Sequence, residues 1–194
     1  MNAARILYPV KVLGPGDRVG LWLCGCKRGC PGCSNPELWH PRPEYEVSVE
    51  ELSRLIDRIA DQYPIDGFTI SGGEPFEQPK ELAQLLGKLC DISNDILIYT
   101  GYRLQQLQTM ENDDVKRILS LAAVIIDGPY VEQQNTGVPL RGSANQTVHL
   151  LRPELAERYA RYLADYQNPI QNFATQDGIV SVGIHRPGFT PHTG

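Results

Sequence analysis

The chain has 194 residues and a net charge of −5, with a hydrophobic fraction of 41% and a charged fraction of 21%. That length fits a single domain over residues 1–194, one that can bury a core without disulfide bonds, and the acidic balance argues against nucleic acid as a partner. No stretch approaches the ~18 uninterrupted apolar residues of a membrane span and no secretory signal begins the chain, so we expect a cytoplasmic protein without a membrane partner.

Strands and helices are expected to alternate along the chain. Apolar runs bounded by glycine, proline or asparagine predict strands, over residues 18–25, 66–75, 95–102, 122–130, 146–151 and 178–184. Helical spacing of leucine, isoleucine and valine predicts helices, after Ser48 and over 79–89, 104–107, 115–121 and 153–166. This alternation indicates the α/β class with a mostly parallel sheet.

The carboxyl ends of parallel strands carry the functional loops of such folds. Four loops of this kind follow predicted strands: the cysteine-rich loop, Gly72-Gly73, Thr100-Gly101 and Asp127-Gly128. Because the carboxyl ends of parallel strands meet at the same edge, we expect these loops to converge on one rim of the sheet.

The stretch "CGCKRGCPGC" places four of the five cysteines within ten positions. Disulfides between them would close very small, strained loops, and clustered thiols in a reducing compartment are typical of metal or redox sites. Cys26, Cys30 and Cys33 have the spacing C-x3-C-x2-C, which favours an iron–sulfur cluster with one iron left open to a small molecule. Zinc is the alternative, with Cys24 or His40 as a fourth ligand, although neither has the usual spacing.

This loop resembles the signature of the radical S-adenosylmethionine (SAM) superfamily. The surrounding blocks resemble the branch that activates the anaerobic (class III) ribonucleotide reductase. They keep their order and spacing from about Tyr8 to Arg152, and read "YPVKVLGPGDRVGLWLCGCKRGCPGCSNPELW", "ISGGEP", "YTGYRLQQL", "IIDGPY" and "LRGSANQTVHLLR". The chain departs from common patterns at Ser34, a place often held by tyrosine, and at Glu74, where aspartate also occurs in the branch. Residues 153–194 are expected to form an extension of a core that covers about 8–152.

The resemblance implies a partial (β/α) barrel of the radical SAM type, open on one side. It also implies a [4Fe-4S] cluster on Cys26, Cys30 and Cys33, with S-adenosyl-L-methionine on the open iron. In relatives, a glycine-rich strand end and an acidic side chain meet the methionine ammonium. Backbone beside the last cysteine meets the adenine, and a further strand end reaches ribose or carboxylate. The corresponding cofactor-binding residues here are Gly32, Cys33, Ser34, Gly72, Gly73, Glu74, Thr100 and Asp127.

The activity implied is reductive cleavage of SAM, with the electron supplied by flavodoxin or ferredoxin, followed by formation of a glycyl radical on the partner reductase. The chemistry is then carried by cofactors, and no catalytic side chain is predicted. Other readings stay open: an activase of another glycyl-radical enzyme, a peptide-modifying radical enzyme, or a zinc- or Fe–S-binding structural module. The turns at Gly72-Gly73, Thr100 and Asp127 could equally be structural.

No chemistry is assigned to several other polar or reactive residues. Cys24 and Cys90 are expected to be buried small side chains, and Trp22 and Trp39 are expected to shield the cysteine loop from water. The polar block of Arg141, Ser143, Asn145 and Gln146 either holds loops around the site or docks the partner.

Overall fold

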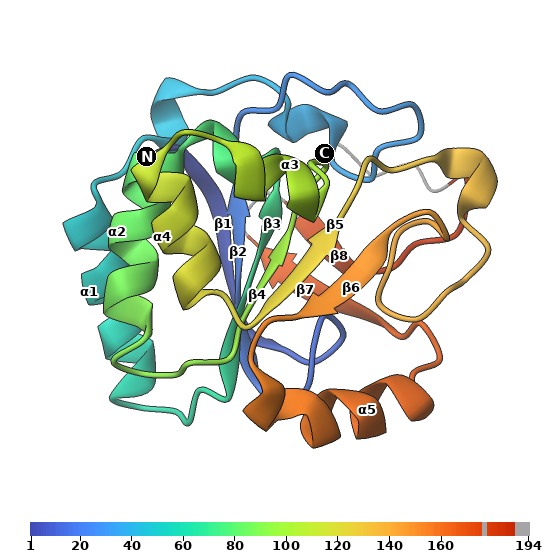
Figure 1. The fold of residues 1–194 in the computed structure, drawn as a ribbon. Coiled ribbons are helices and arrows are strands. Elements are labelled where there is room, and N and C mark those ends of the chain that lie inside the picture. The colour runs from blue at the N-terminus through green and yellow to red at the C-terminus, as the bar shows by residue number, and fades with distance from the viewer. Residues whose placement is uncertain (176–177, 189–194) are drawn as a thin grey trace.

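The computed structural model describes residues 1–175 and 178–188. In this part of the chain, six strands form one sheet in the order β1-β2-β3-β4-β5-β6 (Figure 1). The strands are β1 (Ala3–Val10), β2 (Arg18–Leu23), β3 (Gly67–Gly72), β4 (Ile96–Tyr99), β5 (Val124–Asp127) and β6 (Thr147–Leu150). Strands β2 to β5 run parallel, and β1 and β6 pair antiparallel at the two edges. The predicted α/β class with a mostly parallel sheet is therefore confirmed.

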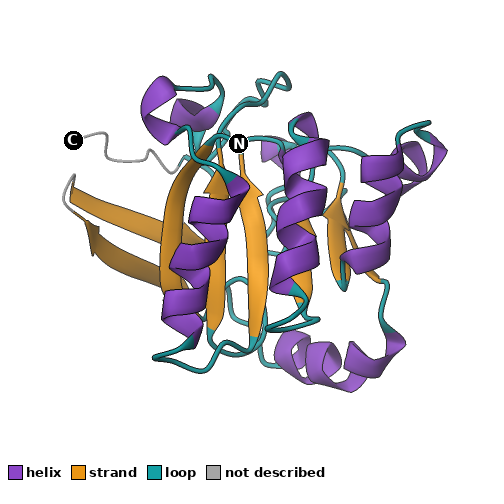
Figure 2. Cartoon of the chain, turned by 90° about the vertical axis from the view of Figure 1, so that its left-hand side faces the viewer, coloured by secondary structure: helices purple, strands orange, loops and turns teal. Residues whose placement is uncertain are grey.

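Three helices cover one face of the sheet, as Figure 2 shows: α1 (Val49–Ala60), α2 (Pro79–Leu89) and α4 (Asp113–Leu121). A capping box begins α1, where the Ser48 side chain accepts from the backbone N–H of Glu51. The central strands present apolar side chains to both faces, because alternate residues point in opposite directions. In β2, Val19 and Leu21 pack under the helices, whereas Trp22 belongs to the core on the other face. Burial on both faces is what a parallel sheet requires.

The C-terminal part of the chain covers the face that the three helices leave open. It consists of α5 (Ala156–Ala164) and an antiparallel hairpin of β7 (Ile170–Thr175) and β8 (Gly178–Gly183). Tyr159 of α5 is buried with residues of β4 and β5, and Val182 of β8 is buried beside Trp22. The expected extension therefore completes the core on this face.

Two strands and one helix start differ from the sequence-based prediction. Strands β1 and β7 were not predicted, and the helix expected from Pro153 begins with a 3-10 turn, Pro153–Leu155, before α5. A further short helix, α3 (Leu104–Thr109), follows β4 as expected. Across the described residues, every helix is too short or too polar to cross a lipid bilayer.

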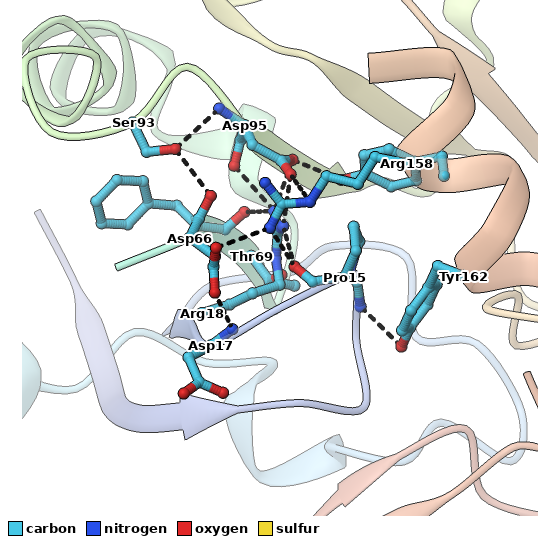
Figure 3. Close-up of polar contacts among 12 residues, drawn as sticks. Pro15, Asp17, Arg18, Asp66, Thr69, Ser93, Asp95, Arg158 and Tyr162 are labelled. Carbon is cyan, nitrogen blue, oxygen red and sulfur yellow. Dashed lines mark hydrogen bonds and ion pairs between the residues drawn. The ribbon is translucent and has the colours of Figure 1, made fainter. Parts of the chain in front are cut away.

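A buried ion pair lies at the amino ends of β2 and β4 (Figure 3). The Arg18 guanidinium has no exposed area and lies 3.1 Å from Oδ2 of Asp95. It also donates to Thr69 and to the carbonyl oxygens of Pro15, Phe68 and Asp95. The hydroxyl of Tyr159 donates to Asp95 over 2.6 Å, which ties α5 to this network.

Candidate metal and cofactor site

One pocket, of about 140 Å³, lies where the predicted loops meet at the carboxyl ends of the strands. It is lined by the cysteine loop, by the ends of β3 and β4, and by the segment after β5. The lining residues are Cys26, Arg28, Cys30, Cys33, Trp39, Ser71, Gly72, Gly73, Glu74, Tyr99, Thr100, Gly101, Gly128, Tyr130 and Gln146. The structure thus brings together Cys26, Cys30, Cys33, Gly72, Gly73, Glu74 and Thr100 of the predicted site.

The cysteine loop is held against the segment that follows it. The backbone N–H of Gly25 donates to Leu38 O over 2.9 Å, and that of Cys26 donates to Trp39 O over 2.8 Å. Gly25 has a φ of +114° and Gly29 a φ of +56°, both in the left-handed region that suits glycine. The loop can therefore turn sharply twice while its first residues stay paired with 38–39.

The glycine pair at the end of β3 is needed for close packing of backbone on backbone. A Cβ at Gly72 would collide with the backbone of Leu23, and one at Gly73 with the carbonyl of Gly25. The N–H of Gly73 donates to Leu23 O, and that of Glu74 donates to Gly25 O, each over 2.8 Å. The glycines therefore let β3 lie close to the start of the cysteine loop.

Glu74 is 1% exposed, and both of its carboxylate oxygens accept hydrogen bonds. Oε1 accepts from the Thr100 hydroxyl over 2.7 Å and from Phe76 N over 3.1 Å, and Oε2 accepts from Gly101 N over 2.8 Å. Burial raises the pKa of the Glu74 carboxyl, and these donors oppose the rise. Thr100, predicted to reach the cofactor, here joins the ends of β3 and β4 through this carboxylate.

The fourth donor to Glu74 is Arg28, a residue of the cysteine loop that was not among the predicted site residues. Nε of Arg28 lies 3.2 Å from Oε2 of Glu74, and the guanidinium stacks 4.1 Å from the ring centre of Tyr102. A neighbouring pair, Lys27–Glu77, spans 2.8 Å. Both ion pairs tie the cysteine loop to the segment after β3.

Three predicted cofactor-binding residues do not line the pocket. Gly32 is exposed and lies close to the carboxylate of Glu132, and Ser34 is partly buried elsewhere on the loop. Asp127 Oδ2 accepts from the N–H of Leu104 over 2.7 Å and lies 3.1 Å from Nε2 of His149. The Asp127 carboxylate therefore holds the first turn of α3.

The donor set of the pocket fits a thiolate-bound cluster. All five cysteines are free thiols, and burial raises the pKa of the Cys26 and Cys33 thiols, so a bound metal would have to displace their protons. In the described part of the chain, no group of three or more His, Cys, Asp or Glu side chains could hold a single metal ion as it stands. The thiolates of a four-iron cluster each bind a different iron and lie farther apart than the ligands of one ion.

Cys24 lies outside this set, as predicted. It is fully buried, and its thiol donates to the carbonyl oxygen of His40 over 3.0 Å. Cys90 is partly buried against the helical core.

The polar block after β5 binds its own loop. The Ser143 hydroxyl accepts from Val131 N, Asn145 donates to Pro129 O, and Gln146 donates to Gly128 O. Arg141 donates to the Gln146 carbonyl over 3.1 Å. These contacts give the block the loop-holding role, one of the two that the sequence left open.

Comparison with known proteins adds the family. The family described as a 4Fe-4S single cluster domain matches residues 12–149. The anaerobic ribonucleoside-triphosphate reductase-activating protein of Salmonella typhi is 32% identical over 153 residues, which are 75% of this chain and 96% of that protein. The protein of the same name from Enterobacteria phage T4 is 34% identical over 151 residues, 75% of this chain and 92% of its own. The chain belongs to this family of activating proteins.

A more distant likeness extends the group to other activases. A putative glycyl-radical enzyme activating enzyme of Haemophilus influenzae is 37% identical over 86 residues, 44% of this chain and 32% of that protein. The resemblance inferred from the motifs is confirmed, and the matched domain, which ends at residue 149, contains every residue that lines the pocket.

Proposed function

We propose that the protein is a radical SAM activase that makes a glycyl radical on an anaerobic ribonucleotide reductase. The observation that carries the proposal is the meeting of three free thiols, Cys26, Cys30 and Cys33, with the ends of β3 and β4 in one pocket. A [4Fe-4S] cluster bound there would supply the electron that cleaves SAM to methionine and a 5′-deoxyadenosyl radical.

The chain's own residues would hold and orient the two cofactors. Cys26, Cys30 and Cys33 would hold the cluster, and the backbone beside Cys33 would meet the adenine. Glu74 is the acidic group that would face the methionine ammonium, and this ammonium would replace the Arg28 guanidinium beside the carboxylate. The other donors to Glu74 are two backbone N–H groups and a buried hydroxyl, which hold the loops in place, so Arg28 is the donor that can be replaced.

We further propose that the sheet is part of a partial (β/α) barrel, with residues 153–194 as an extension of a core that covers about 8–152. Flavodoxin or ferredoxin would be the electron donor, and the cytoplasm the site of action. The pocket lies beside the 131–145 loop, which would border the entry of the partner's glycine-bearing segment.

Cofactor analysis of four cysteine variants tests the proposal. After anaerobic reconstitution, we expect about four iron and four sulfide per chain in the wild-type protein and in Cys24→Ala, and formation of 5′-deoxyadenosine from SAM by both. Cys26→Ala, Cys30→Ala and Cys33→Ala should lose that activity. Stoichiometric zinc in place of iron would make the protein a structural module, and loss of the cluster in Cys24→Ala would refute the ligand set.

A further inference from the structure

The indole of Trp39 has a buried N–H group. Its Nε1 atom is fully buried and meets no acceptor at hydrogen-bond geometry among the described residues. Trp39 lines the pocket together with Cys33. An N–H group buried without a partner costs free energy, so its retention at a ligand site calls for an acceptor.

The backbone around Trp39 fixes where the indole lies. Trp39 ends the 3-10 turn Pro36–Leu38, with its N–H donating to Pro36 O over 3.2 Å, and its carbonyl accepts from Cys26 N. Leu38 beside it has no exposed area. The indole is thus anchored to the cysteine loop itself.

The Cys33 sulfur lines the pocket beside this N–H and already accepts one hydrogen bond. The backbone N–H of Asn35 donates to the Cys33 sulfur over 3.5 Å. The side chain of Trp39 lines the same pocket as this sulfur, with its N–H buried. An N–H group directed at a thiolate sulfur favours negative charge on it.

Resting on the proposed function, we propose that Trp39 is a positioning residue that raises the reduction potential of the cluster by donating its indole N–H to the Cys33 sulfur. A reduced cluster carries one more negative charge, part of which resides on the thiolate sulfurs. Donors to those sulfurs therefore stabilise the reduced form more than the oxidised form. The buried indole N–H would then have an acceptor.

Redox titration of the cluster-loaded protein, without substrate, tests the inference. Trp39→Phe keeps an aromatic ring and removes the N–H, and we expect a midpoint potential more negative than that of the wild-type protein. At a fixed potential the ratio of reduced to oxidised cluster should fall about three- to tenfold, tenfold being about 59 mV for one electron. Trp22→Phe is the matched control, since Trp22 is buried in the core behind the sheet, and its potential should equal that of the wild-type protein.

Iron and sulfide are measured first, so that failure of the proposed function can be distinguished from failure of the inference about Trp39. A wild-type protein without cluster refutes the proposed function itself. If Trp39→Phe loads poorly, benzothienylalanine at this position replaces the N–H by sulfur with almost the same shape, and the same negative shift is expected. An unchanged potential in a loaded variant overturns the inference. An unchanged potential together with weaker SAM binding would also overturn it, and would indicate that the N–H donates to SAM.

Discussion

Replacing Asp95 by asparagine should destabilise the protein strongly while leaving the site intact. Asp95 is 3% exposed, and its carboxylate faces the fully buried Arg18 guanidinium (Figure 3). Asparagine has nearly the same shape and keeps one oxygen for the Tyr159 hydroxyl, but it removes the negative charge that pairs with Arg18. The change therefore isolates the charge from the packing.

The size of the effect follows from the partners that remain. Removing one partner of a buried ion pair costs about 3–5 kcal/mol. Arg18 keeps Thr69 and three carbonyl oxygens as acceptors, so we expect the lower end, about 3 kcal/mol. With a urea m-value of about 2–3 kcal/mol/M, the unfolding midpoint should fall by about 1–1.5 M.

Urea unfolding of the cluster-free protein, followed by far-UV circular dichroism, measures this fall, because a bound cluster would complicate a two-state analysis. Asp113→Asn is the control, since its ion pair with Lys116 is on the surface and its midpoint should not shift measurably. SAM cleavage per cluster should be unchanged in Asp95→Asn, because the pair lies at the opposite ends of the strands. A midpoint shift below about 0.3 M would refute the reasoning.

Three further variants test the site. Arg28→Gln removes the cation that competes with the SAM ammonium for Glu74, so SAM should bind about two- to fivefold more tightly by equilibrium dialysis. Weaker binding would contradict replacement of Arg28 by the SAM ammonium. Gly72 has a φ of +105° and lies against neighbouring backbone, so Gly72→Ala should lower the free energy of unfolding by more than about 1 kcal/mol. Gly87→Ala in α2 should not, and equal stabilities of the two variants would show that the backbone around Gly72 relaxes. Asp127→Ala should cost about 0.5–2 kcal/mol as a lost helix cap with SAM affinity retained, and a loss of affinity would return Asp127 to the cofactor site.

The sequence predicted the parallel core well because its strands are nearly continuous apolar runs. Strands β2 to β5 are buried on both faces, and this pattern is visible without knowledge of their neighbours. Strand β1 includes Pro9 and is only partly buried along most of its length, so it lacks that signal. Strand β7 alternates exposed and partly buried residues, and its pairing with β8 comes from backbone hydrogen bonds.

The site was predictable to the level of its loops but not of its contacts. Spacing and strand ends brought Cys26, Cys30, Cys33 and the segment after β3 together. The direction of a side chain was not visible, so the bond between the Asp127 carboxylate and the start of α3 was not predicted. The Arg28–Glu74 pair had one signal in the sequence: a cation between two cluster cysteines, with an acidic residue at the end of a neighbouring strand.

Electron paramagnetic resonance of the activase with its partner tests the central claim most directly. The reduced, cluster-loaded protein is mixed with SAM and the anaerobic reductase in the absence of oxygen. The account predicts a glycyl-radical doublet on the reductase, present with Cys24→Ala and absent with Cys33→Ala. A reductase that stays radical-free, while another glycyl-radical enzyme or a peptide is modified by the same preparation, would contradict it.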